Sequence, residues 1–139
     1  MKVLVDTSVW SLALRRDGDT LSEEERRFVD ELRSIVEDGR VVMLGVIRQV
    51  LLSGIKGDKT FQRLENALEP FEDYPLTTAD HVRAARLSNL ARNNGVIVSK
   101  ISALVAAVAL NNQLPVFTTD KDFQHLTAVA EIPLHVPQA

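Results

Sequence analysis

The 139-residue sequence contains no cysteine, which excludes disulfide bridges and thiolate metal sites and is consistent with a reducing cytoplasm. Charge imbalance is small as well. With a formal net charge of −3 and a pI near 5.6, any nucleic-acid role must depend on a local basic patch. A strand pattern begins directly after Met1-Lys2, so we expect no signal peptide. The hydrophobic share of 45% excludes a disordered chain and is too low for a membrane-spanning one.

Short apolar runs alternate with helical patterns, and no linker, repeat or low-complexity segment interrupts them. Buried strands are predicted at 3–5, 41–44 and 115–117, with short edge strands at 74–76 and 133–136. Helices are predicted at 9–14, 22–38, 46–55, 58–70, 78–93 and 101–110. This alternation, with no tight hairpin signals, predicts a single α/β domain over residues 1–139. A mainly parallel sheet of about five strands would lie between two helical layers.

Capping residues suggest where the helices begin. Thr7 and Ser8 are expected to cap the first helix, Asp58 the fourth, and Ser22 with Glu25 makes a capping box for the second. Thr77 or Thr78 is the expected cap of the 78–93 helix, and Ser99 or Ser102 that of the apolar helix. Periodicity predicts that the following side chains point inward: Phe61, Leu64, Leu68, Val82, Ala85 and Leu90.

Carboxylates follow two of the predicted strands. Asp6 ends the first strand, and Asp120 and Asp122 follow a late one, so a parallel sheet would bring them to one edge. Converging oxygens are the ligands that Mg²⁺ or Mn²⁺ needs, and such ions can activate water and stabilise a leaving oxygen. The plainer interpretation, that all three cap turns or helices, stays open at this point. The histidines, His81, His125 and His135, show no ligand spacing and are expected at the surface or in packing contacts.

Four segments together resemble the PIN-domain family, and more narrowly the VapC toxins of VapBC toxin–antitoxin modules. They are Val-Asp-Thr-Ser-Val-Trp, Gly-Val-Ile-Arg-Gln-x-Leu-Leu-Ser-Gly-Ile, Leu-Val-Ala-Ala-Val-Ala and Thr-Thr-Asp-Lys-Asp-Phe, and they span essentially the whole chain. The resemblance implies a PIN-like three-layer α/β/α fold and a metal-dependent endoribonuclease site of four acids. It also implies a VapB-like antitoxin, an RNA substrate, a homodimer and a cytoplasmic location. Asp6 matches the first acid and Asp120 the last.

The other two acidic positions depart from the family pattern. Val50 stands where the family has its second acid, and Ser102 stands where the third acid opens the apolar helix. Asp6 and Asp120, with Asp122 as a possible third ligand, could balance the charge of one divalent ion but not two. We therefore expect one weakly held Mg²⁺ or Mn²⁺, and weak or absent cleavage. We also expect Val50 and Ser102 to line the pocket of Asp6 as vacated ligand positions.

Several alternatives remain from the sequence. The chain could be a catalytically inactive PIN domain that binds an antitoxin or RNA. A phosphoacceptor receiver domain is disfavoured because Asp6 has no acidic neighbour, and a haloacid-dehalogenase-type phosphatase because Asp6-Thr-Ser8 lacks a second Asp. A phosphate-facing groove could use these basic residues: Arg15, Arg16, Arg48, Lys56, Lys59 and Lys121. An antitoxin helix is expected to dock on the helices on either side of Asp17–Thr20, with Trp10 and Leu14, and on the 58–68 helix. Dimerisation is expected through the late part of the chain.

Overall fold

The computed structural model describes residues 1–14 and 18–137. Its strands are β1 (Val3–Val5), β2 (Val41–Val42) and β3 (Val116–Phe117). Its helices are α1 (Thr7–Leu14), the short 3₁₀ helix η1 (Gly18–Thr20), α2 (Glu23–Glu37), α3 (Gly45–Leu52), α4 (Asp58–Leu68), α5 (Thr78–Asn93), α6 (Lys100–Asn112) and α7 (Asp122–Thr127). The predicted alternation of strands and helices is confirmed.

The sheet is parallel throughout, with the order β2-β1-β3. Leu4 is opposite Val42 on one side and Val116 on the other, and the whole of β1 is inaccessible to solvent. Each predicted edge strand is reduced to a single parallel bridge, Met43 with Asp73 and Val116 with Leu134. Among the described residues the sheet therefore has three strands, with one bridge beyond each outer strand.

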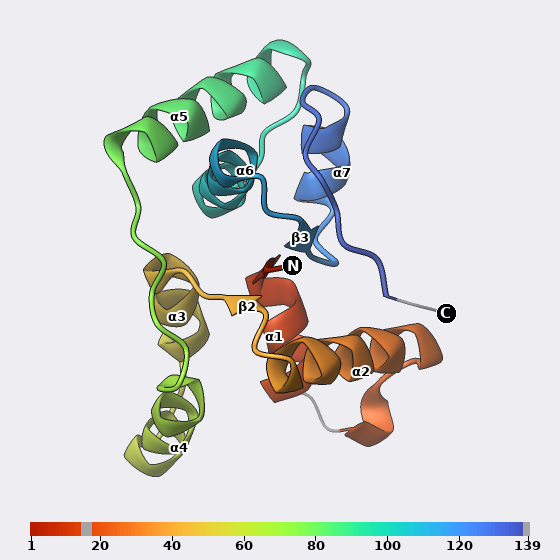
Figure 1. Cartoon of the computed structure of the whole chain (residues 1–139), viewed down its shortest axis with the longest axis vertical. Coiled ribbons are helices and arrows are strands. Elements are labelled where there is room, and N and C mark those ends of the chain that lie inside the picture. Colours follow the sequence, from red (N-terminus) through yellow and green to blue (C-terminus); the bar gives the residue numbers. More distant parts are fainter. Residues whose placement is uncertain (15–17, 138–139) are drawn as a thin grey trace.

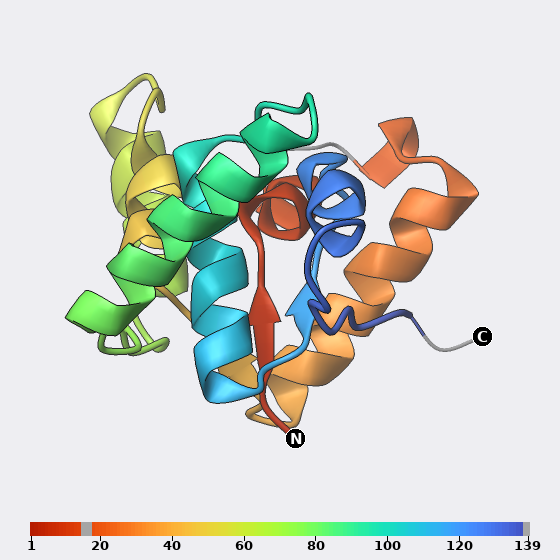
Figure 2. The same ribbon diagram turned by 90° about the horizontal axis from the view of Figure 1, so that it is seen from above.

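Helices cover both faces of this sheet, as a three-layer α/β/α fold requires. In Figure 1, α5 and α6 lie on one side of the strands, and α1 and α2 lie on the other. Figure 2 shows α6 beside β1, and α6 packs against both α5 and β3. Its residues from Val105 to Ala109 are all fully buried, which explains why the sequence of α6 is apolar on nearly every face.

Several helix ends differ from the sequence expectation. The predicted caps Thr7 and Ser8 are wrong, because α1 begins at Thr7 and the Asp6 carbonyl accepts the N–H groups of Val9 and Trp10. Asp58 is the first residue of α4 rather than its cap. The capping boxes of α2 and α5 are present with Ser22 and Thr77 as caps.

The inward faces of α4 and α5 were only partly predicted. Leu64 and Leu68 are buried as expected, but Phe61 is exposed. On α5 the expected face points outward: Val82 is 49% exposed, Leu90 is 39% exposed, and Ala85 is exposed. The buried residues of α5 are Asp80, Leu87 and Ala91. Because α6 presents small apolar residues on every face, α5 can pack on it without a wide apolar stripe of its own.

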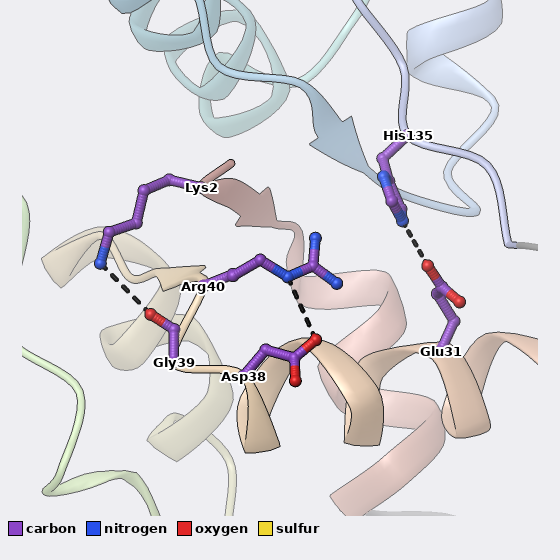
Figure 3. Close-up of polar contacts among 6 residues, drawn as sticks. All are labelled: Lys2, Glu31, Asp38, Gly39, Arg40 and His135. Atoms are coloured by element: carbon purple, nitrogen blue, oxygen red, sulfur yellow. Dashed lines mark hydrogen bonds and ion pairs between the residues drawn. The ribbon is translucent and has the colours of Figure 1, made fainter.

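Three polar contacts outside the sheet are drawn in Figure 3. Lys2 Nζ donates to the Gly39 carbonyl at 3.3 Å, and Arg40 pairs with Asp38 at 3.5 Å. His135 Nε2 lies 2.6 Å from Glu31 Oε2 and joins the C-terminal segment to α2. The His135 ring also meets Phe117 edge-on at 5.2 Å, so this histidine has the packing role expected of it.

No helix in the described ranges, 1–14 and 18–137, combines the length and the apolar character that a bilayer crossing requires.

Candidate active site

Asp6 lies where β1 ends, at the carboxyl edge of the sheet. Its backbone N–H donates to the Phe117 carbonyl at 2.9 Å, which fixes it beside the end of β3. The side chain is buried, with 4% of its surface exposed. Its Oδ2 accepts two hydroxyl hydrogen bonds, from Thr118 Oγ1 at 2.8 Å and from Ser8 Oγ at 3.1 Å. The carboxylate is therefore held from both α1 and the segment that follows β3.

Burial raises the pKa of Asp6 above its ordinary value, because removal from water disfavours the charged form. The hydroxyls of Thr118 and Ser8 and the backbone N–H of Thr7 oppose this rise, since they stabilise the carboxylate. The negative charge of Asp120 adds to the rise in pKa. A buried carboxylate with an upward shift and a second acid close enough to affect it is typical of functional sites.

Asp120 lies at the same edge of the sheet, in the segment between β3 and α7. Its backbone N–H donates to Thr118 Oγ1 at 3.0 Å, so a single hydroxyl connects Asp120 to the Asp6 carboxylate. The Asp120 side chain is exposed, and its Oδ1 accepts the N–H of Asp122 at 2.9 Å. The structure thus brings together the two acids that the sequence placed after separate strands.

Asp122 faces the start of α6. Its Oδ2 accepts the backbone N–H of Ser99 at 2.9 Å, which ties the beginning of α7 to the beginning of α6. One oxygen of this carboxylate is therefore engaged in joining two helices. A negative charge at the N-terminus of α6 is also favourable to the helix dipole.

Ser102 occupies the first turn of α6 and is 3% exposed. It is not the helix cap: Ser99 Oγ accepts the Ser102 N–H at 3.0 Å and donates to Ser102 Oγ at 2.9 Å. Of the two expected caps, Ser99 has that role and Ser102 does not. The small, neutral hydroxyl of Ser102 instead fills a buried position where a carboxylate would carry charge.

Val50 lies in the second turn of α3 and is half-buried. Within the described ranges it does not belong to the hydrophobic core, whereas its neighbours Ile47 and Leu51 are fully buried there. Val46, one turn earlier, lines a cavity of about 480 Å³ together with Ile101 at the start of α6. The early turns of α3 and α6 therefore face each other. That Val50 and Ser102 line the pocket of Asp6 remains a prediction.

Ser8 and Thr118 were missed by the sequence reasoning as parts of this site. Ser8 was assigned to helix capping, and Thr118 was treated only as loop. In the structure Ser8 Oγ also accepts the Thr119 N–H at 3.0 Å, so both hydroxyls hold the loop after β3 against Asp6. The available signal was their position, because each lies within a few residues of a strand end at the edge that carries the acids.

Arg48 does not take part in the expected basic groove. Arg48 donates to Asp73 Oδ1 at 3.0 Å and to the Leu68 carbonyl at 2.9 Å, and it also contacts the Phe71 carbonyl. This guanidinium fastens α3 to the segment after α4 and is not presented to a ligand. The remaining lysines of the set are exposed side chains: Lys56, Lys59 and Lys121. Arg15 and Arg16 lie outside the described residues.

The donor set of this edge is too small for two metal ions. Across residues 1–14 and 18–137, no group of three or more His, Cys, Asp or Glu side chains is arranged to hold a metal. Asp6 and Asp120 are the two carboxylates that the Thr118 hydroxyl links. One or two carboxylates with several waters is an ordinary ligand set for a single Mg²⁺. The residues present therefore fit one ion and do not fit a pair.

The fold and its edge can be compared with known proteins. The crystal structure of FitAcB from Neisseria gonorrhoeae is similar, with a TM-score of 0.74 and 24% identity over 97% of each chain. VapBC2 from Rickettsia felis, bound to a promoter DNA fragment, is similar with a TM-score of 0.71 and 13% identity, over 97% of this chain and 98% of that one. VapBC-5 from Mycobacterium tuberculosis is similar with a TM-score of 0.66 and 21% identity, over 97% of this chain and 98% of that one. No curated protein sequence matches the chain.

The PIN domain model matches residues 3–129, which run from the first residue of β1 to beyond the end of α7. The matched segment includes Asp6, Asp120 and the hydroxyls that connect them. The chain therefore belongs to the PIN domain family.

Proposed function

We propose that this single PIN domain is a VapC-like toxin of a toxin–antitoxin module. Its RNA cleavage would be weak or lost. The observation that supports this proposal is that Thr118 joins Asp6 and Asp120 at one edge. The family resemblance adds that Val50 and Ser102 stand where the other two acids are expected. Two carboxylates in place of four leave the site with half of the negative charge that two divalent ions require.

PIN domains are generally divalent-metal-dependent nucleases. In this chain Asp6 and Asp120 would hold one Mg²⁺ or Mn²⁺, with Asp122 as a possible third oxygen donor. Such an ion, when bound, supplies Lewis acidity to a phosphodiester and lowers the pKa of water. Ser8 and Thr118 orient Asp6 through its Oδ2, and Asp122 positions α6 through the Ser99 amide.

The partners we propose are an RNA strand, a VapB-like antitoxin and a second copy of the chain, in the cytoplasm. Two similar structures carry toxin–antitoxin names: a toxin–antitoxin complex from Klebsiella pneumoniae, and VapBC-5, a member of the VapBC family of toxin–antitoxin systems. The expected antitoxin surface needs one correction: Trp10 is 3% exposed and packs against Phe71, so it belongs to the core. Leu14 and Phe61, at 37% and 36% exposure, remain available to an apolar helix.

The alternative function is a catalytically inactive PIN domain that binds an antitoxin or RNA. Val50 favours it, because a valine has no oxygen and its half-buried side chain cannot ligate a metal or water. Ser102 favours it as well, since its buried hydroxyl already accepts a hydrogen bond from Ser99. This alternative and the weak nuclease differ in one measurable property, which is EDTA-sensitive cleavage by the unmodified chain.

The test restores the missing acids. Val50→Glu and Ser102→Asp are made singly and together, and Mg²⁺ binding by calorimetry is measured beside RNA cleavage with and without EDTA. We expect the double variant to bind Mg²⁺ and to cleave, and each single variant to gain little, because ligands of one site act as a unit. Both measurements are needed because binding reports the site even where the RNA chosen is a poor substrate.

A matched control adds the same two acids elsewhere. Val82→Glu with Ser34→Asp places the carboxylates on exposed positions of α5 and α2 and should leave Mg²⁺ binding and cleavage unchanged. Robust cleavage by the unmodified chain that EDTA abolishes would refute the depleted-site proposal. A folded double variant that neither binds Mg²⁺ nor cleaves would refute the assignment of positions 50 and 102.

A further inference from the structure

A cavity of about 350 Å³ opens beside Asp120, on the side of the sheet covered by α1 and α2. Asp120 and Thr118 line it, and the same two residues belong to the hydrogen-bonded edge that holds Asp6. Any group bound in this cavity would therefore adjoin the two carboxylates of the site. None of the positions that match the family's acids, other than Asp120, lines the cavity.

Part of the wall of this cavity is apolar and well anchored. Leu12 and Phe123, which are 8% and 1% exposed, form part of its lining, and so does Phe28. The Phe28 ring stacks on the buried ring of Phe117 with centroids 5.1 Å apart and planes 10° apart. The C-terminal segment supplies Leu134 as a further wall.

The contact between His135 and Glu31 fixes that segment to α2 (Figure 3). His135 follows Leu134 directly, so the wall of the cavity is attached to the helix that carries Phe28. The pocket is therefore preformed, which reduces the conformational entropy that a bound group must overcome.

The polar groups of the cavity are mostly hydrogen-bond acceptors. Carboxylates come from Glu24, Glu25 and Asp120, hydroxyls from Thr118 and Thr119, and Gln124 adds an amide that can both donate and accept. No hydrogen bond or ion pair to the Glu24 side chain is found within the described part of the chain. A phosphate would be repelled by these carboxylates. The occupant must instead present flat apolar faces together with N–H donors at its edge.

We infer that this cavity binds an amino-bearing nucleobase, such as cytosine or adenine, of an RNA strand that passes along the Asp6–Asp120 edge. Unpaired RNA bases are recognised by stacking on aromatic side chains and by hydrogen bonds along their edges. The exocyclic amine of cytosine or adenine would donate to Glu24, and Gln124 would complete the edge. Uracil carries a carbonyl oxygen at the equivalent place, which has no hydrogen to donate to the Glu24 carboxylate. This inference rests on the proposed RNA-binding function and adds a base preference to it.

The test measures binding rather than cleavage. Fluorescein-labelled hexanucleotides of cytidine, adenosine and uridine are titrated with the full chain in Mg²⁺, which offsets the negative charge of Asp6 and Asp120, and followed by fluorescence anisotropy. We expect the cytidine and adenosine oligonucleotides to bind about fivefold more tightly than the uridine one, which is the effect of one net hydrogen bond. Glu24→Ala should bring this ratio close to one, and Gln124→Ala should lower it.

Glu23→Ala is the matched control, because Glu23 precedes Glu24 in the first turn of α2, is also exposed and does not line the cavity. Both substitutions remove one negative charge and should raise the affinity for all three oligonucleotides alike. Only Glu24→Ala should change the ratio between them. The ratio therefore separates base recognition from general electrostatics.

Equal binding of the three oligonucleotides, or equal ratios in Glu24→Ala and Glu23→Ala, would overturn the base pocket while leaving RNA binding intact. Failure of every oligonucleotide to bind would overturn the proposed RNA function and this inference together. The base pocket would also be overturned if the chain showed no preference among the bases but bound N-acetylarginine amide in a Glu24-dependent way. That result would assign the cavity to a basic side chain of a protein partner.

Discussion

Replacing Asp6 by asparagine should stabilise the metal-free protein at neutral pH. The Asp6 side chain is 4% exposed, and burial raises its pKa, so its ionised form is less favourable in the folded chain than in the unfolded one. An asparagine at this position would have no charge to bury. It would keep one side-chain oxygen to accept the hydroxyls of Thr118 and Ser8, which are the strongest local contacts of the carboxylate.

The gain in unfolding free energy depends on how far folding raises the pKa of Asp6. Each pKa unit by which the folded state exceeds the unfolded state corresponds to about 1.4 kcal/mol of unfolding free energy at a pH above both values. For a chain of this length, 1 kcal/mol changes the melting temperature by about 3–5 °C. We therefore expect Asp6→Asn to melt higher than the unmodified chain at pH 7 in EDTA, by about 4–7 °C for each unit by which folding raises the pKa of Asp6.

The pH dependence gives the sign of the effect independently. Because the pKa of Asp6 is raised on folding, the folded state retains its proton over a range in which the unfolded state has lost it. Its contribution to stability is complete below the unfolded pKa of about 3.9 and declines as pH rises through the folded value. The advantage of Asp6→Asn should therefore be small in acid and should grow to a plateau towards neutral pH.

Thermal melts of both proteins across this pH range, with EDTA present throughout, provide the measurement. Asp30→Asn is a suitable control because Asp30 is exposed on α2, so loss of its charge should leave the melting temperature nearly constant. A melting temperature of Asp6→Asn that equals or falls below that of the unmodified chain at pH 7 would refute the reasoning. It would mean that the hydrogen bonds to the ionised carboxylate outweigh its burial.

Two further substitutions test carboxylates that support the fold. Burial disfavours ionised Asp80, but hydrogen bonds from Asn111 and Thr77 outweigh it and lower the pKa. Asp80→Ala should therefore lose about 1–3 kcal/mol at neutral pH, and progressively less in melts as pH falls through the folded pKa. Asp122→Ala should lose about 1 kcal/mol in urea unfolding, because the Ser99 amide loses its acceptor, and Asp122→Asn should lose less. Asn and Ala variants of equal stability would contradict that role.

The elements of this fold could be predicted from local signals. Val3–Val5 is a short apolar run, and the capping boxes that begin α2 and α5 depend only on residues three apart, Ser22 with Glu25 and Thr77 with Asp80. Parallel pairing then followed from the alternation of strands and helices. The meeting of Asp6 and Asp120 at one edge required no more than that topology.

Features that depend on packing between distant segments could not be predicted in this way. The buried face of α5 is set by α6, so Val82 and Leu90 are exposed although the periodicity placed them inside. The hydrogen bond from the Ser99 amide to the Asp122 carboxylate could not be predicted either, because the two residues are 23 positions apart and nothing local indicates the contact. The hydroxyl of Thr118 acquires its role only once β3 lies beside β1.

The departures at positions 50 and 102 can be understood from the same electrostatics. One exposed acid, Asp120, already contributes to the raised pKa of buried Asp6. If positions 50 and 102 line the pocket of Asp6, as predicted, two more carboxylates there would add like charge, and with no metal bound this repulsion would destabilise the folded chain. Val50 and Ser102 remove that repulsion, and with it the negative charge that would attract a second ion. A site depleted in this way favours a stable metal-free fold over metal affinity. The double restoration should therefore show its gain in Mg²⁺ binding together with a lower melting temperature in EDTA.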